Sequence, residues 1–182
     1  MTEPSTETVY EGRFLRIDRR GAWEYAARTN ARGGVAVIAL HDDGRIVLVE
    51  QHRPPVDAFV VEPPAGLSGD TDDSESLLES ARRELEEETG YTARAWQRLE
   101  TAYASPGMTD EAITFFLARG LTKTGKGGGV DAENITVHEV PLDDLPRWLA
   151  ARGGPIDMKL YAGLFAASAA IEDESSHEHH HD

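Results

Sequence analysis

In the segment RELEEETG, residues 83–90, Glu84 lies about one helical turn before Glu87 and Glu88. Their spacing of i, i+3 and i+4 places the carboxylates on one face of a helix, where like charges repel. A divalent cation would relieve that repulsion, and Mg²⁺ binds one or two carboxylates and completes its shell with water and substrate phosphates. The pattern favours a magnesium site for a phosphorylated ligand. The alternative, a solvated acidic helix face, is the commoner meaning of such a run taken alone.

The helix that must position these glutamates is predicted within residues 72–90, DDSESLLESARRELEEETG. Asp73 or Ser74 is a suitable N-cap, and Gly90 is a suitable residue after the last turn. An apolar stripe at helical spacing predicts the buried face: it comprises Leu77, Leu78, Ala81 and Leu85.

A hairpin is predicted upstream, where VAVIAL (35–40) and RIVLVEQHR (45–53) flank the turn residues Asp43 and Gly44. Strands interspersed with helices predict one α/β layered domain. Further strands are expected within 9–30 and at 59–66, 97–103, 112–118 and 135–141, and helices within 142–154 and at 156–171.

Composition narrows the class of protein. The chain has 182 residues and no cysteine, and the absence of cysteine excludes disulfides and thiolate metal sites. Its formal net charge of −15 argues against nucleic-acid binding. The polar, acidic start is not a signal peptide, and the longest apolar run, near residues 160–171, is too short to span a bilayer. We expect a cytoplasmic protein with disordered ends at 1–8 and 172–182.

The acidic segment also carries fixed residues at fixed distances: Gly69, Glu75, Arg83, Gly90 and the three glutamates. Their arrangement resembles the Nudix box, G-x5-E-x7-R-E-U-x-E-E-x-G-U with U apolar, at every fixed position. The resemblance implies an α/β/α sandwich with a mixed β-sheet over residues 31–171 and hydrolysis of a nucleoside diphosphate linked to another moiety. It further implies that the glutamates bind Mg²⁺ (Mn²⁺ as alternative), with the Ala65 carbonyl of PPAG completing the shell. Glu75 and Arg83 would then orient the helix.

A narrower resemblance rests on Pro106, which lies fifteen residues after Tyr91 within SPGMTDE (105–111), and on EQHRP (50–54). With EPPAG and YEGRFL, these residues are similar to the ADP-ribose pyrophosphatase branch, whose products are AMP and ribose 5-phosphate. EPPAG departs from the branch in the residue before its second proline. The Gly-rich segment TGKGGG (124–129) is an insert that we interpret as a flexible loop.

In that branch the N-terminal strands, here 9–30, swap across a homodimer and their aromatics stack on adenine. Trp23 and Tyr25 are the candidates, with dimer-core packing as the alternative. Arg53 resembles the arginine that contacts a phosphate or the terminal ribose, with a surface ion pair as the alternative, and Arg28 is a second candidate. The remaining candidate substrate-binding residues are Pro106, Gly107 and Glu111.

The sequence offers two candidates for the catalytic base, a loop carboxylate and a glutamate of the Nudix box. The branch places one on a loop before the last strand, which here suggests Glu133, with Asp131 as competitor and mere solubility as the alternative reading of both. A glutamate of the box, Glu87 or Glu88, is the other choice, with water as the nucleophile. Competing functions are hydrolysis of another nucleotide, such as GDP-mannose or an oxidised nucleoside triphosphate, and a non-catalytic nucleotide sensor.

Overall fold

A mixed sheet organises the chain. The computed structural model describes residues 5–31, 33–69, 74–129 and 134–178, with side chains up to residue 171. The strand order is β10-β5-β4-β9-β8, with β6 paired to β5 and β7 paired to β4. The pair β4–β9 is parallel and the other pairs are antiparallel. The strands are β4 (Gly33–Leu40), β5 (Arg45–Arg53), β6 (Ala58–Glu62), β7 (Ala65–Ser68), β8 (Tyr91–Tyr103), β9 (Ala112–Lys123) and β10 (Thr136–Pro141).

Alternating residues of the central strands build two cores, one on each face of the sheet. On β4, Ile38 and Leu40 enter one cluster, whereas Val35, Val37 and Ala39 enter the other. This is the period of two that a strand buried on both faces imposes. The hairpin predicted from VAVIAL and RIVLVEQHR is confirmed as β4 and β5, with Gly44 in a left-handed conformation (φ 81°) at the turn.

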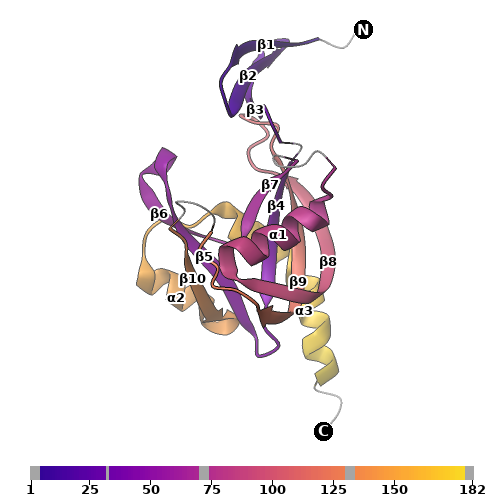
Figure 1. Ribbon diagram of the computed structural model, residues 1–182, viewed down its shortest axis with the longest axis vertical. Coiled ribbons are helices and arrows are strands. Elements are labelled where there is room, and N and C mark those ends of the chain that lie inside the picture. The colour runs from indigo at the N-terminus through magenta and orange to yellow at the C-terminus, as the bar shows by residue number, and fades with distance from the viewer. Residues whose placement is uncertain (1–4, 32, 70–73, 130–133, 179–182) are drawn as a thin grey trace.

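Helices cover both faces, which gives the α/β/α layering (Figure 1). Helix α1 (Leu77–Thr89) packs Ala81 and Leu85 into one core. Helices α2 (Leu145–Arg152) and α3 (Met158–Glu178) supply Leu145, Leu149 and Leu160 to the other. Two short 3₁₀ turns, η1 (Pro54–Val56) and η2 (Leu142–Asp144), complete the described elements. The predicted fold class is confirmed.

The N-terminal strands form a separate antiparallel sheet at one end of the molecule (Figure 1). It comprises β1 (Thr6–Glu11), β2 (Leu15–Arg20) and β3 (Trp23–Arg28). Backbone hydrogen bonds join Ala26 of β3 to Met108 (2.8 Å) and Asp110 (3.4 Å) in the loop between β8 and β9. The sheet therefore docks on the segment SPGMTDE that sequence analysis singled out.

Several expected boundaries are wrong. Strand β1 begins at Thr6, because residues 6–8 pair with β2, so they are not a disordered end. Helix α3 continues to Glu178, so most of the expected disordered tail is helical. Strand β8 begins at Tyr91 rather than near residue 97, because it pairs with β9 along almost its whole length.

In the part of the chain that the structure describes, no helix combines the length and hydropathy that crossing a membrane requires.

Candidate active site

Helix α1 is fixed at both ends by its own sequence. Ser76 accepts a hydrogen bond from the amide of Glu79, and the Glu79 carboxylate accepts one from the amide of Ser76, which forms a capping box. Ser76, not Asp73 or Ser74, is therefore the N-cap. Gly90 ends the helix in the left-handed region (φ 71°), as predicted. Ala81, Leu85 and Glu88 are buried, and Glu84 lies on the flank of this buried face.

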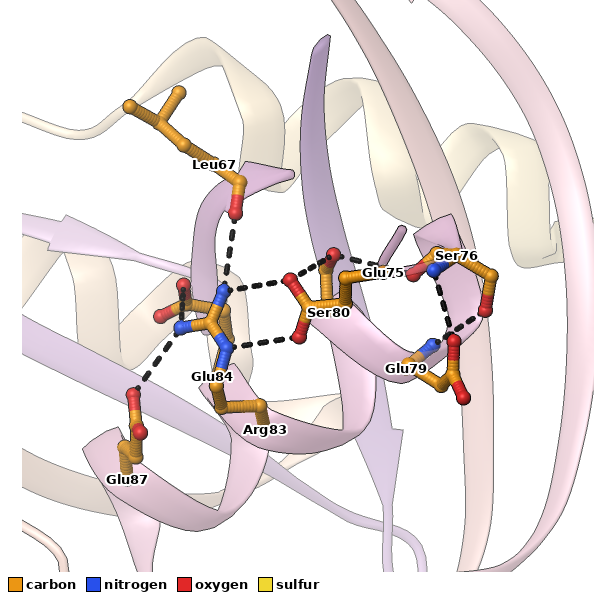
Figure 2. A network of polar contacts seen from close by, with 8 residues as sticks. All are labelled: Leu67, Glu75, Ser76, Glu79, Ser80, Arg83, Glu84 and Glu87. Atoms are coloured by element: carbon orange, nitrogen blue, oxygen red, sulfur yellow. Dashed lines mark hydrogen bonds and ion pairs between the residues drawn. The ribbon is translucent and has the colours of Figure 1, made fainter. Parts of the chain in front are cut away.

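Arg83 connects helix α1 to the segment before it and to strand β7 (Figure 2). Its Nε donates to Glu75 Oε1 (3.0 Å) and its Nη2 donates to the Leu67 carbonyl (3.1 Å). Its Nη1 donates to Glu84 Oε1 (2.8 Å) and Glu87 Oε2 (3.3 Å). These contacts hold the pKa of the Glu75 carboxyl below its ordinary value. One guanidinium thus ties together the segment before α1, strand β7 and two acidic side chains.

Glu88 is the buried member of the box, with 5% of its surface exposed. Its Oε2 accepts from the amide of Ala65 (3.0 Å) and its Oε1 accepts from Gln51 Nε2 (3.3 Å). Burial raises the pKa of Glu88 to about 8, against the opposing effect of the Ala65 hydrogen bond. The neighbouring carboxylates Glu84 and Glu62 raise it further. Both hydrogen-bond partners are neutral, so the carboxylate has no directly bound cation among the described residues.

Gly66 of β7 leaves the space that the Glu84 carboxylate occupies. A Cβ built there would lie 2.0 Å from Cδ of Glu84, which is closer than any real contact. The Glu84 carboxylate therefore lies directly against the β7 backbone, in the turn whose Ala65 carbonyl sequence analysis proposed as a metal ligand. Gly69, one residue past β7, adopts a positive φ of 79°, which favours glycine.

A cavity of about 310 Å³ opens between α1, β7 and the end of β5. Carboxylates of Glu84 and Glu88 line it, together with Glu111, and cationic side chains of Arg28 and Arg53 line it as well. The structure therefore brings together six of the residues predicted from sequence: Arg28, Arg53, Ala65, Glu84, Glu88 and Glu111.

Both predicted arginines are ion-paired. Arg53 donates to the fully buried Glu62 through Nε (2.5 Å) and Nη2 (2.7 Å). These hydrogen bonds raise the pKa of the Arg53 guanidinium above its ordinary value, so it stays charged. Arg28 of β3 donates from Nε to Glu111 Oε1 across 2.9 Å, and Nη2 lies 2.8 Å from the same oxygen. The ion pair that was the alternative for Arg53 is present, although its partner Glu62 is buried and Arg53 itself lines the cavity.

The carboxylates of the site are suitable ligands for a hard divalent cation, although those that the structure describes do not converge on one point. Within the described residues, no three acidic or histidine side chains converge on a common point. Glu84 and Glu87 are turned to Arg83, and Glu88 is turned to Ala65. Mg²⁺, however, needs only one or two protein carboxylates and takes its other oxygens from water and phosphate. A buried carboxylate without a bound cation, beside a second carboxylate, supplies that set.

A second cavity, of about 400 Å³, lies under the N-terminal sheet and gathers the other predicted substrate-binding residues. Its lining includes Trp23 and Tyr25 of β3 and Pro106 and Gly107 of the β8–β9 loop. Trp23 is 67% exposed, so one face of its indole is open to solvent. Aromatic rings beside a proline make a surface suited to a flat, apolar ligand.

The Gly-rich segment is anchored on the end of helix α1, contrary to the expected flexible loop. The amides of Gly128 and Gly129 donate to the carbonyls of Glu88 (2.8 Å) and Glu87 (3.0 Å). A Cβ on Gly127 would lie 2.3 Å from the Thr89 carbonyl carbon. The glycines therefore let one backbone pack directly on another and supply donors to carbonyls that a helix end leaves without partners.

Some predicted residues are not placed in the cavity. Glu87 does not line it, because its carboxylate faces Arg83 and is partly exposed. Glu133 and Asp131 lie outside the described residues. Sequence analysis missed three residues at or behind the cavity wall: Gln51, Glu62 and Lys159. Gln51 and Glu62 belong to motifs already noted, EQHRP and EPPAG, whereas no sequence signal marks Lys159.

Comparisons with known proteins agree with this geometry. Residues 30–163 match the protein family described as NUDIX domain. A "Methanol dehydrogenase activator" of Bacillus methanolicus is 34% identical over 151 residues, which cover 79% of this chain and 80% of that protein. An "ADP-ribose pyrophosphatase" of Bacillus subtilis is 39% identical over 121 residues, which cover 66% of this chain and 64% of that protein.

A solved structure has the same fold. It is described as "Crystal structure of ADP compounds hydrolase" and superposes with a TM-score of 0.71 at 20% identity. The similarity covers 96% of this chain and 97% of the other, so it includes the N-terminal sheet as well as the sandwich.

Proposed function

This chain belongs to the Nudix family, and we propose that it hydrolyses the diphosphate bond of ADP-ribose, or of a related ADP-sugar, to AMP and ribose 5-phosphate. The observation that carries the proposal is the cavity of about 310 Å³ in which the carboxylates of Glu84 and Glu88 share a wall with β7 and two arginines complete the lining. A diphosphate needs both groups: carboxylates to hold its metal ion, and arginines to pair with its phosphate oxygens. The ADP-ribose pyrophosphatase of Bacillus subtilis supports the nucleotide class.

We assign the metal to Glu84, Glu88 and Glu87 with the Ala65 carbonyl, and we expect Mg²⁺, with Mn²⁺ as the alternative. When bound, such an ion neutralises phosphate charge, polarises phosphorus and lowers the pKa of a coordinated water. Within the protein, Gln51 and the Ala65 amide fix the position of the Glu88 carboxylate by two hydrogen bonds. Arg83 holds the Glu84 and Glu87 carboxylates near each other on α1, which supports their assignment to one metal site.

The remaining parts of the substrate are assigned by charge and shape. Arg53 and Arg28 lie where they attract the phosphates, because both guanidinium groups line the cavity. Trp23 and Tyr25, with Pro106 and Gly107, make the surface proposed for the adenine ring. Glu111, held by Arg28, positions substrate or water, and the base is Glu133 or a glutamate of the box.

We propose that a homodimer is the working form, with the N-terminal sheet in the interface. Large apolar side chains on or next to that sheet are exposed, including Tyr10 (64%), Phe14 (55%) and Trp23 (67%). Exposed apolar groups of this size on one small sheet are typical of a surface that another chain covers. Sedimentation of the purified protein tests this independently of activity.

The test of the proposed function is hydrolysis of ADP-ribose by the purified protein with Mg²⁺, followed as AMP release. ADP-glucose, GDP-mannose and dGTP serve as competitor substrates, and EDTA serves as the metal control. AMP release from ADP-ribose that EDTA abolishes is the expected result. Activity on GDP-mannose or dGTP alone would keep the metal site and overturn the substrate assignment. Binding of ADP-ribose without hydrolysis of any compound would favour a nucleotide sensor.

A further inference from the structure

A buried carboxylate at the edge of the cavity holds two cations, not one. Glu62 ends β6 and is 0% exposed. Arg53 of β5 binds both its oxygens, and Lys159 Nζ lies 3.4 Å from Oε2. A carboxylate without water is stable only when such partners replace its hydration. Glu62 thereby fixes two positive side chains, from a strand and from a helix far along the chain, at one place.

Lys159 is the second residue of α3, and its environment restricts the ammonium group. The side chain is 19% exposed and also pairs with Asp157 Oδ2. The amide of Lys159 donates to Asp157 Oδ1 (2.7 Å), which fixes the backbone from which the side chain extends. An ammonium group has three donors. Asp157 accepts from one of them and Glu62 is ion-paired at 3.4 Å, so at least one N–H is left for a ligand.

Arg53 is in the same situation. Its Nε and Nη2 are used by Glu62, and no partner for Nη1 is found in the part of the chain that the structure describes. Both Arg53 and Lys159 line the cavity of about 310 Å³. Lys159 also lines an adjoining cavity of about 180 Å³, whose wall includes Tyr103 and Met158. The lysine therefore lies where the phosphate cavity meets a smaller, more apolar space.

We propose that Lys159 is a substrate-binding residue whose ammonium group donates to a phosphate oxygen of the diphosphate, with Glu62 as the residue that positions both Lys159 and Arg53. This inference rests on the proposed function for its ligand class. The competing explanation is that Lys159 only joins α3 to β6 through Glu62. The two differ in one respect: a ligand contact acts on phosphate-bearing ligands alone, whereas loss of a structural link affects every ligand.

The experiment is calorimetric titration of the full chain with ADP-ribose and with adenosine, in EDTA so that turnover does not interfere. Lys159→Met removes the ammonium group and keeps an unbranched side chain. Lys126→Met is the matched control, because Lys126 is exposed and lines none of the three cavities described. We expect Lys159→Met to raise the Kd of ADP-ribose at least about tenfold, and to leave the Kd of adenosine unchanged. Lys159→Arg should recover part of the lost affinity, since it restores the charge.

Other outcomes separate this inference from the proposed function. An unchanged Kd for ADP-ribose in Lys159→Met, or an equal loss for ADP-ribose and adenosine, overturns the role of Lys159. Wild-type protein that binds ADP-ribose without hydrolysing it, and loses affinity in Lys159→Met, refutes the proposed function and keeps the inference. Wild-type protein that binds neither ligand in EDTA and also releases no AMP from ADP-ribose with Mg²⁺ overturns both. If Lys159→Met does not fold, Lys159→Gln replaces it, because an amide still donates to Glu62 and Asp157.

Discussion

The amide of Ala65 donates a hydrogen bond to Glu88 Oε2 across 3.0 Å, so the turn after β6 and the last turn of α1 meet at a single buried carboxylate. That contact joins the two segments to which the metal site is assigned. Because the contact uses a side-chain oxygen, Glu88→Gln can remove the charge of residue 88 while leaving its shape nearly unchanged.

Glu88→Gln tests the metal assignment. A glutamine oxygen can still accept from Ala65, so the free energy of unfolding should change little, whereas the charge that binds the cation is lost. We expect kcat for ADP-ribose to fall by several orders of magnitude, measured as AMP release at saturating Mg²⁺. A fall in kcat of less than about tenfold would show that Glu88 is not a metal ligand.

Arg83→Gln tests the architectural role of the guanidinium. The substitution removes the guanidinium hydrogen bonds to four residues, Glu75, Leu67, Glu84 and Glu87. We expect the free energy of unfolding to fall by about 2 kcal/mol in urea titrations, because partly buried carboxylates lose their partner.

Arg82→Gln is the control for that experiment. Arg82 is the adjacent residue and is exposed, and among the described residues its guanidinium lies 6.0 Å from the centre of the Trp96 ring without an ion pair. Its loss should change the free energy of unfolding by no more than about 0.5 kcal/mol. Equal effects of the two substitutions would contradict the role given to Arg83.

Gly127→Ala tests the packing of the Gly-rich segment on helix α1. The new Cβ would lie 2.3 Å from the Thr89 carbonyl carbon, and the backbone there has a positive φ of 66°. We expect a loss of about 2 kcal/mol or more in the free energy of unfolding and a lower kcat, because the segment must move off the helix end. Gly125→Ala, whose Cβ would meet only Gly90 Cα at 3.8 Å, should be close to wild type in both measurements.

The lowered pKa of the Glu50 carboxylate leads to a prediction of how the free energy of unfolding depends on pH. Hydrogen bonds from Arg152 and His138 lower its pKa below the ordinary value, with Arg152 the larger cause. A lowered folded-state pKa means that this stabilisation is complete above the unfolded-state pKa, about 4.3, and is lost as the pH falls through the folded value. Glu50→Gln should therefore flatten the loss of stability below about pH 4.3 in urea titrations. Glu100→Gln, at an exposed position on β8, should keep the wild-type pH profile.

Local patterns predicted the elements and the acidic half of the site. The apolar stripe of Ala81 and Leu85 and the terminal Gly90 act within one helix, so spacing alone was sufficient. The wrong N-cap is instructive, because Ser76 and Glu79 carry the S-x-x-E pattern of a capping box and the sequence therefore held the signal.

Arg28 and Arg53 were named from the family resemblance, but Lys159 and the ion pairs of the cavity wall could not be obtained from local patterns. Arg53, Glu62 and Lys159 come from β5, β6 and α3, and only the tertiary fold makes them neighbours. The Gly-rich segment was misread for a related reason. Glycines predict conformational freedom when the neighbouring backbone is unknown, but here they permit contact with the end of α1.

Arg28 belongs to the N-terminal sheet and yet forms part of the wall of the cavity of about 310 Å³, where it meets Glu111. A ligand that contacts both Arg28 and the sandwich binds the docked arrangement of the sheet better than any other arrangement. The affinity of the cavity for that ligand and the docking equilibrium of the sheet are therefore linked. Saturation with substrate must then slow hydrogen exchange at the Ala26 amide, which is bonded to Met108, by the same factor by which undocking weakens binding. A molecule that binds the docked sheet with a different affinity from the undocked sheet would then change the affinity of the cavity for its ligand.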